Sequence, residues 1–116
     1  MEFVTFDTGS LATRELHPLL LDGISPRPIA FASTMDEKGR PNLAPFSFFN
    51  VFSANPPVLI FSPARRGRDN TTKHTLENVL KVPEVVVNLV DFAMVEQCSL
   101  ASGDFPEGVS EFEKAG

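Results

Sequence analysis

The chain has 116 residues, 10 Lys and Arg against 15 Asp and Glu, 42% apolar residues and a single cysteine. This length fits one domain over residues 1–116, and the apolar fraction excludes a disordered chain. No apolar run approaches the roughly 18 residues of a membrane-spanning helix. The N-terminus lacks the basic and apolar regions of a signal peptide, and one cysteine cannot form an internal disulfide, so we expect a cytoplasmic protein without a membrane partner.

Prolines punctuate the first two-thirds of the chain, so we expect short strands and turns there rather than helices. Residues 28–34 and 42–46 are predicted to form two strands of a hairpin, joined by a polar, glycine-containing turn at 36–40. Residues 48–53 continue as an extended segment. Residues 57–62 carry an unbroken apolar run, which is typical of a strand buried on both faces.

The second half of the chain alternates helices with one strand. Apolar residues at helical spacing predict a short amphipathic helix over 75–81. A valine-rich strand follows at 84–90, and Asp91 is a plausible N-cap for a helix from residue 92 to about 101. Residues 103–116 show little periodicity. Because strands come in consecutive runs, the pattern favours a mainly β, antiparallel α+β domain or small barrel.

Charge is unevenly distributed along the sequence. Residues 1–76 carry eight basic and seven acidic groups, whereas residues 77–116 carry two basic and eight acidic groups. We expect the acidic stretch from Asp104 to Glu113 to be solvated. Concentrated positive charge, suited to an anion, occurs only in the run that contains Arg65, Arg66, Arg68 and Lys73.

The usual side-chain catalytic motifs are absent from the sequence. It has no Gly-x-Ser-x-Gly elbow, P-loop or Gly-x-Gly-x-x-Gly motif. His17 and His74 lack metal-ligand spacing, and Cys98 has apolar neighbours typical of a small buried hydrophobe. If the chain belongs to an enzyme, a bound cofactor therefore carries the reaction.

Two segments suit an aromatic cofactor that bears a phosphate. In the segment 42–50, Pro45 interrupts the strand ladder, and Ser47 and Asn50 add hydrogen-bonding groups. We expect at least half of its phenylalanines to be core residues instead. The segment 62–75 combines arginines, Lys73 and threonines before a helix start, where a phosphate is favoured. The alternative for this second segment is a solvated basic loop.

An ordered set of motifs resembles the flavin reductase-like family, whose fold is an FMN-binding, Greek-key antiparallel split barrel. Its members include flavoredoxins and the flavin reductase components of two-component monooxygenases. The most specific match is the run Asn-Leu-Ala-Pro-Phe-Ser-Phe-Phe-Asn at 42–50. The other matches are Pro26–Phe31, Ser33 and Thr34, 36–39, Ser53 with Pro56 and Pro57, Ser62, Lys73–Thr75, 77–79, Val86–Leu89 and Glu111–Gly116.

The chain departs from the family pattern in two ways. His74 replaces the aspartate of the family's Lys-Asp-Thr element. The family also continues well past the motif at 111–116, with strands that close the barrel. We therefore expect an incomplete barrel, belonging to the N-terminal portion of a longer protein or to a short relative. Its open strand edges would be covered by another chain, as in a homodimer.

The resemblance implies FMN as the cofactor and NADH or NADPH as its reductant. The implied function is an NAD(P)H-dependent flavin reductase, or the reductase component that serves a monooxygenase partner. The alternatives are an FMN-binding electron carrier with an electron-transfer partner and a nucleic-acid-binding module, against which the acidic charge argues. The implied cofactor-binding residues are Ser33, Thr34, Asn42, Ala44, Pro45, Phe46, Ser47, Phe48, Ser62, Arg65, Arg66, Lys73 and Thr75.

Overall fold

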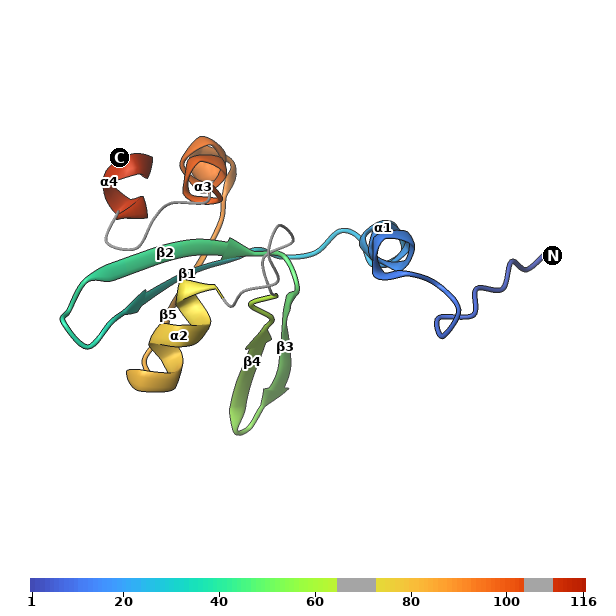
Figure 1. Cartoon of the computed structure of the whole chain (residues 1–116), viewed down its shortest axis with the longest axis horizontal. Coiled ribbons are helices and arrows are strands. Elements are labelled where there is room, and N and C mark those ends of the chain that lie inside the picture. Colours follow the sequence, from blue (N-terminus) through green and yellow to red (C-terminus); the bar gives the residue numbers. More distant parts are fainter. Residues whose placement is uncertain (65–72, 104–109) are drawn as a thin grey trace.

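The computed structural model describes residues 1–64, 73–103 and 110–116 of the chain, and Figure 1 shows the arrangement of its elements. In chain order these are α1 (Thr13–Gly23), β1 (Ala30–Met35), β2 (Pro41–Phe46), β3 (Phe49–Ala54), β4 (Pro57–Phe61), α2 (His74–Lys81), β5 (Val86–Leu89), a 3₁₀ turn (Phe92–Met94), α3 (Val95–Ala101) and α4 (Glu111–Ala115). The strand pairs within these ranges are antiparallel, which confirms the α+β expectation.

Three of the strands form a sheet in the order β2–β1–β5. Thr34 lies opposite Asn42 in the β1–β2 hairpin, and Phe31 lies opposite Asn88 in the β1–β5 pair. The connecting turn needs a backbone conformation that glycine favours, and Gly39 occupies it with φ of 77°. The hairpin predicted from the sequence is therefore present.

Both faces of this sheet are covered by helices, α2 on one side and α3 with α4 on the other (Figure 1). On the α2 side, Ala30, Ala32 and Phe46 pack with Phe49 of the next strand. On the opposite side, the buried residues of the cluster are Phe31, Leu43, Cys98 and Ala101. Since side chains alternate faces along a strand, the hairpin β1–β2 supplies both cores.

Strands β3 and β4 form a separate two-stranded sheet that follows the end of β2 (Figure 1). Ser47 and Phe48 connect β2 to β3. The prediction that the strand at 57–62 is buried on both faces is wrong. Leu59 is 53% exposed and Ile60 is 49% exposed. No further layer of the described residues covers the hairpin, so its apolar run faces outward.

Helix α1 contradicts the expectation that the prolines exclude helices from this part of the chain. Pro18 lies inside α1, where it removes one backbone hydrogen bond. The Glu15 carboxylate accepts a 2.8 Å bond from the N–H of Ala12 at the helix start. At the helix end, Arg27 Nη1 donates to the carbonyl oxygens of Leu21, at 2.6 Å, and Ile24. These contacts at both ends stabilise a helix that buries no side chain.

The predicted helix after Asp91 is confirmed, and its first turn is 3₁₀. The Asp91 carboxylate accepts a 3.1 Å bond from the N–H of Met94, as an N-cap does. Cys98 is buried, which confirms its reading as a small core residue. The expectation of a solvated acidic stretch is wrong at Glu111, which is 6% exposed at the start of α4. Residues 104–109 of that stretch lie outside the described ranges.

Among the helices of the described ranges, none combines the length and the apolar run that crossing a bilayer requires.

Candidate functional site

Three separate segments meet at Phe46, the last residue of β2. The Phe46 and Phe61 ring centroids lie 5.0 Å apart, which joins the ends of β2 and β4. Lys73 Nζ lies 5.2 Å from the centroid of the Phe46 ring, immediately before α2 begins. At this separation an ammonium group is attracted by the negative face of the ring. The sequence singled out the segments 42–50 and 62–75, and the structure brings Phe46 of the first close to Lys73 of the second.

The corner between the two sheets, formed by Ser47 and Phe48 after β2 and by Ser62 after β4, offers polar and aromatic groups that a ligand can reach. The N–H of Ser62 donates a 2.9 Å bond to the carbonyl oxygen of Phe48, which holds the end of β4 against the corner. Ser62 is exposed, Ser47 is half-buried, and Phe48 is 36% exposed. By contrast, Phe46 is only 3% exposed. Phe46 therefore belongs to the core, and Phe48 is the aromatic side chain at this corner that is open to contact.

Phe48 is also contacted by the N-terminal part of the chain. The Arg27 guanidinium lies 5.8 Å from the centroid of the Phe48 ring, and the His17 ring lies 6.0 Å away. Arg27 and His17 were not predicted as site residues. Arg27 did stand in the sequence within the Pro-Arg-Pro match, so the signal was present but carried no assigned role.

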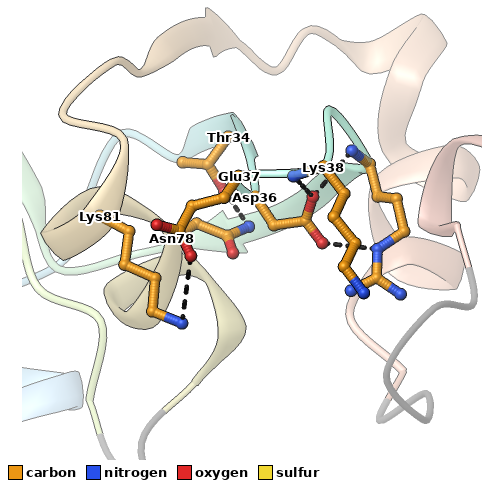
Figure 2. Close-up of polar contacts among 7 residues, drawn as sticks. Thr34, Asp36, Glu37, Lys38, Asn78 and Lys81 are labelled. Atoms are coloured by element: carbon orange, nitrogen blue, oxygen red, sulfur yellow. Dashed lines mark hydrogen bonds and ion pairs between the residues drawn. The ribbon is translucent and has the colours of Figure 1, made fainter.

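Three of the predicted site residues take part in a buried polar network instead of facing solvent. Asn42 Nδ2 donates a 2.9 Å bond to Thr75 Oγ1, and Asn78 Nδ2 donates a 3.1 Å bond to Thr34 Oγ1 (Figure 2 shows the second). Thr34, Asn42 and Thr75 are 3%, 7% and 1% exposed. Since buried polar groups must be hydrogen-bonded, this network fixes the start of α2 against the β1–β2 hairpin.

The remaining predicted residues are divided between the two faces of the sheet. Ala44 lies on the α2 face, together with Phe46. Ser33 and Pro45 are at alternate positions and project to the other face, away from Lys73. Arg65 and Arg66 lie outside the described residues.

His74 lies away from the Phe46 ring that its neighbour Lys73 contacts. His74 lines a polar hollow of about 510 Å³ between α2 and the β1–β2 turn, together with Asn78 and Lys81. On the turn, the Asp36 carboxylate accepts two 2.9 Å bonds from the N–H groups of Lys38 and Arg40 (Figure 2). The Arg40 N–H bond is the main cause that lowers the pKa of Asp36, followed in the same direction by the Arg40 side chain.

The model of the flavin reductase like domain family matches residues 23–116. The chain belongs to this family. This flavin reductase-like chain is 46% identical over 116 residues to a protein of Aquifex aeolicus (strain VF5). The match covers 100% of the chain and 57% of that protein.

Two solved structures show the fold of this flavin reductase-like chain. Nitrilotriacetate monooxygenase component B from Bacillus cereus superposes with a TM-score of 0.90 at 30% identity, over 99% of this chain and 56% of the other. A protein with a split barrel domain from Shewanella frigidimarina NCIMB 400 superposes with a TM-score of 0.69 at 26% identity, over 96% and 55%. The split-barrel expectation is confirmed, although the described strands do not close a barrel. The chain spans a little over half the length of these relatives.

Family membership implies a flavin cofactor, and the groups at the corner fit one by their chemistry. Lys73 supplies a positive charge for an anionic ligand group, and the Ser47 and Ser62 hydroxyls can donate and accept hydrogen bonds. The partly exposed Phe48 ring supplies an apolar, planar surface.

Proposed function

We propose that this chain binds FMN at the corner between its two sheets and forms part of an NAD(P)H-dependent flavin reductase. The observation that carries the proposal is the convergence at Phe46, where Lys73 and the end of β4 meet the strand with the most specific family motif. When bound, a flavin supplies two-electron chemistry that no side chain of the chain provides.

The chain's own residues supply binding and orientation in this proposal. Lys73 and Ser62 bind the phosphate, and the sequence assigns the same role to Arg65 and Arg66 of the basic run. Ser47 and Phe48 contact the ring side. Thr34, Asn42 and Thr75 act indirectly, because their buried hydrogen bonds hold the beginning of α2, and with it Lys73, in a fixed position. An ordered set of groups of this kind lowers the entropic cost of aligning two reactants.

The proposal extends to a homodimer. Val51 and Phe52 of β3 are 61% and 66% exposed, and they share the outward-facing hairpin with Leu59 and Ile60. Apolar side chains gathered on one element are typical of a contact surface. The molar mass of the purified protein, measured by light scattering, would be twice that of one chain.

An absorption spectrum of the purified protein, titrated with FMN and followed by NADH or NADPH addition, tests the proposed function. We expect flavin absorption to shift on binding and nicotinamide oxidation to depend on flavin. Tight flavin binding without nicotinamide oxidation would instead support an electron carrier. Failure to bind any flavin at saturating concentration would overturn the proposal.

A further inference from the structure

The outer edge of strand β2 is occupied by a carboxylate in place of a neighbouring strand. Within residues 1–64, 73–103 and 110–116, β2 is an edge strand of its sheet and pairs only with β1. Glu111 Oε2 accepts a 3.3 Å hydrogen bond from the N–H of Leu43, although Glu111 comes 68 residues later in the chain. Glu111 is 6% exposed and Leu43 is 5% exposed, so this bond is shielded from water.

The two other outward-facing positions of β2 carry prolines. In an antiparallel pair, alternate residues direct their N–H groups toward the partner strand and away from it. Since the Leu43 N–H points away from β1, the backbone nitrogen atoms of Pro41 and Pro45, two residues to either side, also face away from β1. Proline has no N–H. None of these three positions therefore offers a free donor to an added strand.

The bond to Glu111 is linked to the candidate site through Asn42, the residue that precedes Leu43 in the same strand. Asn42 donates to Thr75 at 2.9 Å, and Thr75 lies in the first turn of α2, two residues after Lys73. β2 is thus held at its edge by α4 and on one face by α2. A shift of the strand at Leu43 would move Asn42 and the beginning of α2 with it.

We propose that Glu111 is a positioning residue: it replaces a neighbouring strand at the edge of β2 and so fixes Lys73 relative to Phe46. The effect on the cofactor rests on the proposed function, whereas the effect on the strand edge does not. Removing one partner of a buried hydrogen bond is destabilising, because the other partner is left unsatisfied. Here the group left behind is the Leu43 N–H.

Hydrogen exchange of the Leu43 amide, measured by NMR, tests the edge role directly. In the unaltered protein this amide is expected to be protected even though it faces away from β1; free exchange would overturn the proposal without any variant. Glu111→Leu is expected to reduce protection about tenfold, in line with the loss of one buried bond. Glu111→Gln keeps a carbonyl oxygen as acceptor and is expected to retain most of the protection.

Glu113→Leu is the matched control, because Glu113 is an exposed carboxylate on the same short helix. It is expected to leave both Leu43 exchange and FMN affinity unchanged. Glu111→Leu is expected to raise the FMN dissociation constant, with partial rescue in Glu111→Gln. Equal effects of the Glu111 and Glu113 substitutions would overturn the positioning role. If the unaltered protein binds no FMN, the proposed function fails, while the exchange of Leu43 still decides the role of Glu111.

Discussion

Asn42 and Thr75, which lie 33 residues apart in the sequence, are joined by a buried 2.9 Å hydrogen bond between the Asn42 amide and the Thr75 hydroxyl. Thr75 is 1% exposed, so water cannot replace either partner. The bond connects the strand that carries the most specific family motif to the helix that follows the basic run in the sequence. It is therefore a structural link between the two halves of the candidate site.

Replacing Thr75 by Val should destabilise the protein. Valine preserves the shape of threonine but leaves the Asn42 amide without its acceptor, at a cost of about 1–3 kcal/mol. Urea denaturation followed by circular dichroism measures the change in the free energy of unfolding. Thr75→Ser keeps the hydroxyl and is the matched control; a loss as large as that of Thr75→Val would contradict the role of the hydrogen bond.

Replacing Lys73 and Arg66 together by Ala should weaken FMN binding more than riboflavin binding. Only FMN carries a phosphate, and charge-assisted hydrogen bonds to a phosphate are about twice as strong as neutral ones. Flavin fluorescence titrations measure both affinities. Lys81→Ala is a suitable control. Lys81 is the last residue of α2, and its ammonium group pairs with the Glu37 carboxylate at 3.7 Å. Equal losses for FMN and riboflavin would count against the phosphate assignment.

The contribution of Asp36 to stability should depend on pH. Hydrogen bonds from Arg40, first from its backbone N–H, hold the pKa of the Asp36 carboxyl below its usual value. A folded-state pKa that is depressed means that the stabilisation is present above the unfolded pKa and is lost as pH falls through the folded pKa. The difference in unfolding free energy between the unaltered protein and Asp36→Asn should therefore narrow as the pH falls from the unfolded pKa of Asp36 through its folded pKa. A difference that stays constant with pH would refute this assignment.

Cys98 should react slowly with thiol reagents while the protein is folded. Burial raises the pKa of the Cys98 thiol, and only the thiolate is an efficient nucleophile. Alkylation by iodoacetamide, followed by mass spectrometry, should be slow in buffer and fast in denaturant. Because the unfolded thiol loses its proton at lower pH than the folded one, stability should also fall as pH rises through the ordinary thiol range. Rapid labelling of the folded protein would contradict the buried position.

Local patterns predicted the hairpin β1–β2, the helix α2 and the Asp91 cap, because each depends on neighbouring residues. Helix α1 is a local feature that the sequence missed, because Pro18 predicts its absence whereas the bonds of Glu15 and Arg27 at its two ends stabilise it. Other missed features depend on residues that are distant in sequence. The run at Leu59 and Ile60 predicted burial, but burial requires a covering layer, which the strand's own sequence does not encode.

In the candidate site, too, the sequence predicted local features and missed those that depend on contacts between distant segments. The sequence singled out Lys73 and Phe46, and the structure brings them within 5.2 Å. It could not distinguish exposed side chains from those used in packing: Thr34 and Asn42 are buried, whereas Ser62 is exposed. Glu111 was expected in solvent, because a carboxylate is seldom buried without a partner. Its partner is a backbone N–H, which carries no side-chain signature.

The alternation of residues along β2 also protects the protein against misalignment during folding. A slip by one residue would turn Asn42 toward the apolar Phe31 side and Leu43 toward the polar network of α2. The same slip would direct the backbone nitrogen atoms of Pro41 and Pro45 toward β1. Because proline has no N–H, each would leave a carbonyl oxygen of β1 without a hydrogen-bond donor. Since side-chain burial and backbone pairing penalise the error together, incorrectly aligned hairpins should be short-lived on the way to the native state.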